Sequence, residues 1–484
     1  MPLAALRGQS GRMHIGQQEW ERLQAAGAAG SSRDLYQRLA DGQPDAATRA
    51  EAAAFLRGQV ARLDPAASEL PASPDGLLAW MEAGMRDVHA RYGQYLEERR
   101  AGAPRRFFTN RAHALHVLRS VAPTKLVDGA WLYGLVRHAR NPRMADLVRT
   151  YVEELGEGDE DKNHVVLYRQ LLARYALDPL DGLEDTLYEQ GAIQLALASC
   201  AEEFLPEVVG FNLGYEQLPL HLLITAYELN ELGLDPYYFT LHVTVDNSDT
   251  GHARRACQAV LDMLPRMDDG GEFWRRVRTG AQLACAGLGT MDVIRAFDIE
   301  QEALRILQRK AVFGNGAHSD YCRVAGRSVN DWLRTPESMG DFVRALQQAG
   351  WIRLGEPAER SRFWNLLQGP RAEMFGVFTS YELQVLHDWI RGAASVDGQP
   401  YTTAGETPAR RTPTFRALAR TQLPHKADAP SPTLDPDLQL WRERFRSAAP
   451  EQRFELLVDA MSPGRHWTPA GLEATRIFWA QMAG

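Results

Sequence analysis

Two histidines and two aspartates lie close together in the sequence YYFTLHVTVDNSDTGHARRA, which spans residues 237–256. His242 and Asp246 are four residues apart and Asp249 follows three residues later, so on one helix the three side chains share a face. His252 lies three residues beyond Asp249. Imidazoles and carboxylates that point the same way favour a mid-row divalent metal such as iron, manganese or zinc. The same residues also fit the capped, solvated start of a helix.

Other parts of the chain offer partners for such a metal. Asp161 and His164 are three residues apart, which is the carboxylate–histidine spacing found in di-iron helical bundles. Glu207 follows Pro206 and is expected in the first turn of a helix. Each feature also has a simpler interpretation, since an acidic run is typical of a solvated surface and a first-turn glutamate balances the helix dipole. Jointly they predict ligands from several helices that meet in a bundle core.

The overall composition limits the classes of partner. The chain has 484 residues, of which 45% are hydrophobic and 24% charged, and a net charge of −8. A negative chain gives no electrostatic support for a nucleic-acid partner. No apolar run approaches the roughly 18 residues that span a bilayer, and the N-terminus lacks the continuous apolar core of a secretory signal. Four cysteines without a CxxC motif indicate reduced thiols, so we expect a cytoplasmic protein with a small-molecule substrate.

Apolar residues recur at helical spacing along most of the chain, as in 77–100, 110–123 and 124–140, and no stretch alternates with the period of a strand. This pattern predicts an all-α protein. Gly156 and Gly158 predict a break between a helix that carries Glu153 and Glu154 and a helix that resumes near His164.

Composition and turn signals divide the chain into five parts. We expect an N-terminal helical extension over 1–75, a helical bundle over 76–330 and a C-terminal helical subdomain over 331–396. A segment rich in Pro, Thr and Ala over 397–433 is typical of a linker. The last part, 434–484, is expected to be a helical tail.

Five segments resemble the haem-oxygenase-like non-haem di-iron oxidases, also described as iron-containing redox enzymes. They are APTKLVDGAWL (122–132), EELGEGDEDKNHVVLYR (153–169), LPEVVGFNLGYE (205–216), LHVTVDNSDTGHA (241–253) and MFGVFTSYELQVLHDWI (374–390). The resemblance covers roughly residues 85–395. It implies a haem-oxygenase-like helical bundle that can form a homodimer. It also implies an oxidase or oxygenase of specialised metabolism, which activates O2 at two Fe(II) ions. The implied reactions are N-oxygenation or oxidative C–C cleavage of a small amine, an amino-acid-like compound or a carboxylic acid.

The resemblance also implies a set of metal ligands. One helix would supply Glu154, Asp161 and His164, and the central helix would supply Glu207. The last helix would supply His242 and Asp246, followed by Asp249 or, if a bulge turns the helix, by His252. Asp128 falls near a glutamate of the first family helix. The predicted ligands are therefore Glu154, Asp161, His164, Glu207, His242, Asp246, Asp249 and His252.

Three other interpretations remain open from the sequence. A metal-free enzyme of the same fold would use Cys200 as a nucleophile, with Glu207 seven residues later on the same helical face. A non-catalytic partner protein would use the Trp-rich segment 331–396 and the tail as its interaction surface. A haem enzyme would need an axial histidine, for which His113 and His116 are the candidates.

Overall fold

The computed structural model describes residues 31–392 and 434–483, apart from residues 42, 179, 181, 246–250, 268–269, 315, 317, 320 and 370–371. The regular structure of these residues is helical, except for an antiparallel pair of two-residue strands, β1 (Arg323–Val324) and β2 (Arg327–Ser328). The predicted all-α class is confirmed. The predicted linker over 397–433 lies outside the described residues. Among the helices described, none is both long and apolar enough to cross a bilayer.

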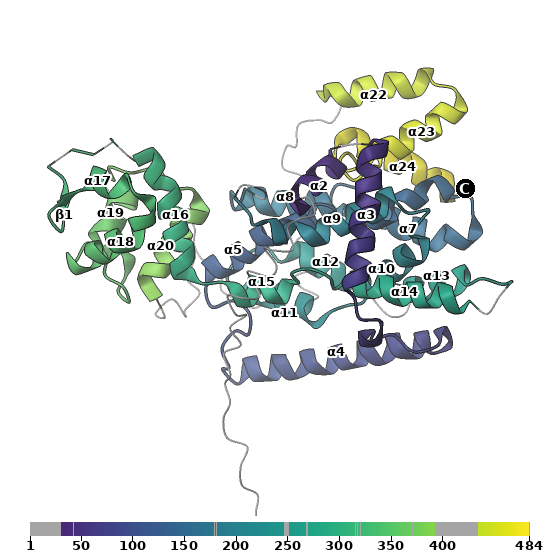
Figure 1. Ribbon diagram of the computed structural model, residues 1–484, viewed down its shortest axis with the longest axis horizontal. Coiled ribbons are helices and arrows are strands. Elements are labelled where there is room, and N and C mark those ends of the chain that lie inside the picture. The colour runs from purple at the N-terminus through teal and green to yellow at the C-terminus, as the bar shows by residue number, and fades with distance from the viewer. Residues whose placement is uncertain are drawn as a thin grey trace, which may run out of the picture.

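The body of the molecule is built from the helices that precede residue 299 (Figure 1). The α-helices are α2 (Ser32–Ala40), α3 (Ala46–Arg62), α4 (Leu77–Arg100), α5 (Arg111–Ser120), α6 (Ala122–Lys125), α7 (Ala145–Glu154), α8 (His164–Arg174), α9 (Glu189–Ser199), α10 (Leu205–Tyr215), α11 (Leu220–Glu231), α12 (Tyr237–Val245), α13 (His252–Met263), α14 (Gly271–Leu283) and α15 (Thr290–Ala296). The 3₁₀ helices are η1 (Pro65–Ala67), η2 (Pro74–Gly76), η3 (Ala130–His138), η4 (Pro142–Met144), η5 (Gly156–Gly158) and η6 (Asp185–Tyr188). Figure 1 shows α4 along the lower edge of this body.

Apolar side chains form two buried clusters that run through the body and continue beyond it. The first includes Tyr168 of α8 and Tyr238 of α12. The second includes Trp131 of η3, Tyr151 of α7 and Phe211 of α10. Helices α7, α10 and α13 therefore pack in one core, while α8 and α12 pack in the other.

A smaller helical unit lies at the left of Figure 1. It contains α16 (Ile299–Gly314), α17 (Val329–Leu333), η7 (Pro336–Ser338), α18 (Met339–Gln348), η8 (Ala358–Arg360), α19 (Arg362–Gln368) and α20 (Ser380–Arg391). Helices α16 and α20 are joined by a hydrogen bond from Tyr381 to Glu302 of 2.8 Å and by an ion pair of 2.9 Å between Lys310 and Glu382. The structure thus includes α16 in the unit that the sequence placed over 331–396.

The helical tail packs on the body beside α7. It contains α22 (Pro436–Ser447), α23 (Pro450–Ala460) and α24 (Pro469–Ala483), drawn in yellow in Figure 1. The Tyr151 hydroxyl donates to the carbonyl of Met461 at 2.5 Å. Gly158 lies against α24 so closely that a Cβ there would be 2.4 Å from the carbonyl oxygen of Leu472. The tail therefore covers the connection between α7 and α8.

Helices α10 and α14 approach each other backbone to backbone. A Cβ added to Gly210 would lie 1.9 Å from the carbonyl oxygen of Val277, and one added to Gly280 would lie 2.2 Å from that of Glu207. Glycine is needed at both positions because any side chain would separate the two helices.

Replacing Gly210 with Ala is therefore expected to lower the free energy of unfolding by about 3 kcal/mol, through overpacking. The matched control is Gly84→Ala in the middle of α4, where an added Cβ meets nothing within 4 Å. That substitution should raise the free energy of unfolding by about 0.5–1 kcal/mol, because glycine is a poor helix former. Chemical denaturation of the two variants checks this, and equal effects would contradict the close contact between α10 and α14.

Candidate metal centre

The connection between α7 and α8 brings a carboxylate next to an imidazole. Glu154 is the last residue of α7 and His164 is the first residue of α8. The chain reverses between them through Gly156 and Gly158, which have φ of +64° and +84°, a region that favours glycine. The predicted break is thus confirmed. A Glu154 oxygen contacts Nδ1 of His164, and both side chains are buried.

A first cluster of candidate ligands is formed by Asp128, Glu154, His164 and His242, all of them buried. The Asp128 Oδ2 atom lies 3.2 Å from Nε2 of His242 and 4.0 Å from Nδ1 of His164. Nδ1 of His242 lies 2.8 Å from the carbonyl oxygen of Tyr238. A carbonyl oxygen only accepts, so Nδ1 carries a proton, and Nε2 faces Asp128 either with a second proton or with a lone pair. Two lone pairs at this distance require a proton or a metal ion between them.

A second cluster is formed by Glu154, Glu216 and His252, again all buried. Nδ1 of His252 lies 3.1 Å from a carboxylate oxygen of Glu154 and 3.1 Å from one of Glu216. The other ring nitrogen, Nε2, lies 3.0 Å from Glu153, which also pairs with Arg255. A partner on the far ring nitrogen is how proteins orient a histidine ligand.

Glu154 belongs to both clusters. Its Oε2 atom faces His164 and its Oε1 atom faces His252, which is the arrangement of a carboxylate that bridges two ions. Gly129 makes room for this side chain, because a Cβ at Gly129 would lie 2.8 Å from Cβ of Glu154. Gly129 has a φ of +79° and lies between α6 and the 3₁₀ helix η3. The sequence predicted one continuous helix over 124–140 instead.

The buried carboxylates of the centre are stabilised by positive charge nearby. Burial alone would lower the pKa of His252, but the charge of Glu216 and the hydrogen bonds that the ring donates to Glu153 and Glu154 raise it well above its usual range. Burial likewise opposes ionisation of Asp128, yet Lys125 and His242 lower its pKa to about 2. Oδ1 of Asp128 and Oε1 of Glu216 have no hydrogen-bond partner among the described residues. Unpartnered buried carboxylate oxygens beside imidazole nitrogens fit a divalent metal ion.

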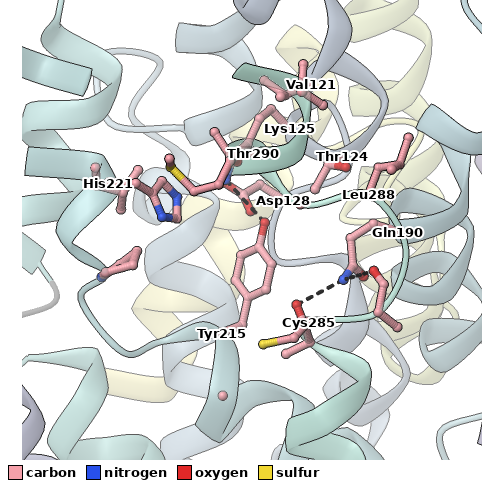
Figure 2. A pocket seen from close by; sticks show the side chains of 18 of the residues that line it. Val121, Thr124, Lys125, Asp128, Gln190, Tyr215, His221, Cys285, Leu288 and Thr290 are labelled. Atoms are coloured by element: carbon pink, nitrogen blue, oxygen red, sulfur yellow. Dashed lines mark hydrogen bonds between the residues drawn. The ribbon is translucent and has the colours of Figure 1, made fainter. Parts of the chain in front are cut away.

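A cavity of about 350 Å³ opens onto both clusters. Asp128 and His242 of the first cluster, Glu216 of the second and the shared Glu154 line it, and Figure 2 shows Asp128 beside Lys125 and Tyr215. A second cavity of about 430 Å³ lies next to it. The two share wall residues Ser120, Leu187, Leu288, Asp292 and Val293.

Four of the predicted ligands come together in this centre, namely Glu154, His164, His242 and His252. Asp246 and Asp249 lie outside the described residues. Helix α12 spans Tyr237–Val245, and α13 begins at His252 after the extended backbone of Gly251. The expectation that a bulge would keep His252 on the helix of His242 is therefore wrong.

Two predicted ligands are not brought to either cluster. Glu207 forms a bidentate ion pair with Arg276. Asp161 lies in the turn before α8, where its carbonyl accepts from Tyr237 at 3.1 Å. The three-residue spacing from Asp161 to His164 is therefore not a helical spacing, and Glu154 takes the place expected for Asp161.

Sequence reasoning missed Glu216 and left Asp128 outside the ligand set. Glu207 and Glu216 are nine residues apart, which is half a turn beyond two full turns, so they face opposite sides of α10. Gly210 and Gly214 lie on the Glu207 side and contact α14. This pair of glycines was the signal that the Glu207 side faces another helix and that Glu216 faces the interior site.

The competing enzymatic interpretations depend on Cys200, His113 and His116, and each of these side chains contacts residues outside the two clusters. The Cys200 thiol donates to the carbonyl of Arg49 at 3.6 Å, and burial together with Glu203 raises its pKa to about 11, which disfavours the nucleophilic thiolate. Nε2 of His113 lies 2.9 Å from the carbonyl of Ile294, and Nδ1 of His116 lies 3.1 Å from the Tyr381 hydroxyl.

Comparison with known proteins agrees with this geometry. Residues 115–284 match the iron-containing redox enzyme family. The resemblance predicted from the sequence is therefore confirmed, and it supports an iron-dependent oxidoreductase. The matched segment contains every residue of the two clusters. No curated protein and no solved structure matches the chain.

The tail supports the loop that carries the ligands. Asn163 caps α8 through a bond of 3.0 Å from the amide of Val166 to its Oδ1. Its Nδ2 donates to the carbonyl of Leu155 and to Nδ1 of His466, both at 3.1 Å. Burial and then Arg169 lower the pKa of His466 to about 3, so the ring is neutral and can accept this bond. His466 thus fixes the cap immediately before His164.

A pH-dependent stability follows from His466. Protonation favours the unfolded chain, so the stability contributed by the neutral ring is complete above about pH 6.5 and is lost as the pH falls from 6.5 toward 3. His466→Gln keeps an acceptor for Asn163 without a titrating group. When the pH falls from 7.5 to 5.0, the free energy of unfolding should fall by about 1–2 kcal/mol less in this variant than in the unmodified chain.

Urea denaturation at the two pH values measures this difference. His89→Gln, at an exposed position on α4, is the matched control and should leave the pH dependence as it is. His466→Ala should lower stability at pH 7.5 by about 1–3 kcal/mol, because it leaves a buried donor unsatisfied. If His466→Gln lost as much stability as His466→Ala at pH 7.5, Asn163 would not need an acceptor at this position, because glutamine still provides one.

Proposed function

We propose that this chain is a non-haem di-iron oxidoreductase that uses O2 to oxidise a small molecule bound in the cavity. The observation that carries this proposal is the sharing of Glu154 between two buried clusters of carboxylates and imidazoles. Imidazole and carboxylate ligands with open positions suit non-haem iron. The match to the iron-containing redox enzymes supports iron over manganese or zinc.

Each side chain would have a defined role. Asp128, His164 and His242 would hold one ion, while Glu216 and His252 would hold the other. Glu154 would bridge the pair. The chemistry that such an iron pair supplies is the activation of O2 for oxidation of a bound substrate.

Partners outside the two clusters would keep these ligands in place. The Tyr238 hydroxyl donates to Asp128 at 2.6 Å, and the Tyr238 carbonyl fixes the proton of His242 on Nδ1. Glu153 holds His252 from the far side. Such contacts raise ligand basicity and fix ring orientation.

The cavity gives the substrate access to the centre. Its wall includes apolar side chains such as Trp131, Leu222 and Met291 beside the candidate ligands. Apolar walls exclude water from the reacting groups. We propose N-oxygenation or oxidative C–C cleavage as the reaction, on a small amine, an amino-acid-like compound or a carboxylic acid.

Anaerobic titration of metal-free protein with Fe(II), followed by metal analysis and O2 consumption, tests the proposal. We expect about two ions per chain, one for each cluster. Glu154→Ala should abolish tight binding of both ions, because both clusters use this carboxylate. His242→Ala should leave about one tightly bound ion. Its affinity for iron at the first cluster should fall by more than the roughly 10–100-fold that is typical when a residue that only supports a metal ligand is lost.

Glu207→Gln is the matched control, because it changes a buried glutamate on α10 that contacts Arg276 instead of the clusters. It should retain about two ions. Two tightly bound ions in Glu154→Ala, or loss of iron in Glu207→Gln, would contradict the ligand assignment. No iron uptake by the unmodified chain would instead favour a non-catalytic partner protein.

A further inference from the structure

Lys125 brings a positive charge into the cavity beside the candidate metal centre. It is the last residue of α6 and lines the cavity together with Asp128, three residues later. Its Nζ atom donates to the Tyr215 hydroxyl at 3.2 Å and lies 5.3 Å from the centre of the Tyr215 ring and 5.9 Å from that of Tyr238. Figure 2 shows the lysine and tyrosine side chains meeting in the cavity.

The ammonium group has unused hydrogen-bonding capacity. A lysine side chain offers three donors, and the Tyr215 hydroxyl is its single hydrogen-bond acceptor among the residues that the structure describes. No carboxylate of those residues lies within ion-pair distance of Nζ. Thr124 and Ser120 line the same cavity and carry hydroxyl groups. The remaining N–H donors of the Lys125 ammonium group are therefore available to a ligand.

The lysine is charged despite its surroundings. Burial alone would lower its pKa, but Asp128, Tyr215 and Glu154 raise it above the usual value. Among the described residues, Lys125 is the single lysine or arginine that lines this cavity. The neighbouring imidazole of His221 is neutral, since burial and then Lys125 lower its pKa to about 4.

Metal binding would change the balance of charge around Lys125. Two divalent ions would exceed by one the negative charges of the three described carboxylates, Asp128, Glu154 and Glu216. Lys125 adds a further positive charge on the cavity side. The carboxylate of Asp292 also lines the cavity, but Arg295, at 3.7 Å, compensates its charge, and the Gly289 amide donates to it at 3.1 Å. A site of this sign favours an anion and disfavours an ammonium group.

We propose that Lys125 binds a carboxylate group of the substrate, so that the substrate of this cavity is an organic acid and not a simple amine. This inference rests on the proposed function, because the positive balance depends on the metal pair. The carboxylate accepts hydrogen bonds from Nζ of Lys125, while the rest of the molecule contacts the apolar wall formed by residues such as Leu222 and Met291. Lys125 is thereby a specificity-determining residue.

Isothermal titration of Fe(II)-loaded protein under anaerobic conditions tests this inference, with hexanoate and hexylamine as probes of equal chain length. Hexanoate should bind and hexylamine should bind at least about tenfold more weakly, since a charge-assisted hydrogen bond is replaced by repulsion. Lys125→Met keeps the length and apolar stem of the side chain without the charge. It should weaken hexanoate binding about tenfold or more.

Lys310→Met is the matched control, because Lys310 pairs with Glu382 in the smaller helical unit and does not line the cavity. It should bind hexanoate as the unmodified chain does. Circular dichroism checks that the variants are folded. If Lys125→Met fails to fold, the preference of the unmodified chain for hexanoate over hexylamine and the behaviour of Lys125→Arg, which keeps the charge, decide the question.

The iron content of each sample separates this inference from the proposed function. With iron bound, equal affinity of Lys125→Met and the unmodified chain for hexanoate overturns the inference alone. Equal or tighter binding of hexylamine, or no binding of hexanoate, overturns it as well. If the unmodified chain takes up no iron but binds hexanoate through Lys125, the di-iron function fails and the role of Lys125 stands.

Discussion

The burial of three carboxylates next to three imidazoles is the constraint on which this fold depends. Asp128, Glu154 and Glu216 lie inside the protein, where an uncompensated carboxylate is strongly destabilising. Protons on the histidines compensate part of this charge, as the raised pKa values of His164 and His252 indicate. Metal ions would compensate it more completely, since each ion replaces a proton with two positive charges. A buried group of this composition is therefore difficult to explain as packing alone.

Such a centre needs rigid support, and the support comes from the whole chain. Helices of one hydrophobic core carry Glu154 and His252, while helices of the other carry His164 and His242. Gly129 admits the Glu154 side chain. The tail, far outside the matched segment 115–284, supplies His466 as the acceptor for the residue that caps α8. The candidate centre is thus not a self-contained property of the matched segment.

The sequence predicts the parts of this centre that depend on local chemistry. Two glycines with a helix on either side correctly predicted the turn between Glu154 and His164, because glycine is poor in helices and free at positive φ. His242 and His252 were found from their residue type. The prediction failed where the outcome depends on which side of a helix faces the interior. Glu207 and Glu216 sit in one apolar helix, and the close approach of α14 through Gly210 decides between them. The break at Gly251, whose backbone is extended, was missed for a similar reason, since the apolar spacing on either side of it is compatible with one helix.

The arrangement of ligand types around the cavity has a consequence for access. Three of the four candidate ligands that line the cavity are carboxylates, while the imidazoles of His164 and His252 lie behind them. His252, which does not line the cavity, is fixed by Glu153 on its far nitrogen, so it cannot turn without breaking this part-buried contact. A carboxylate can bind a metal through one oxygen or two and can therefore open a coordination position without leaving the site. The side of the centre that faces the cavity is thus the adaptable side, and the side away from it is held rigid. Because Lys125 stands on the adaptable side, its charge acts where a substrate and O2 would arrive.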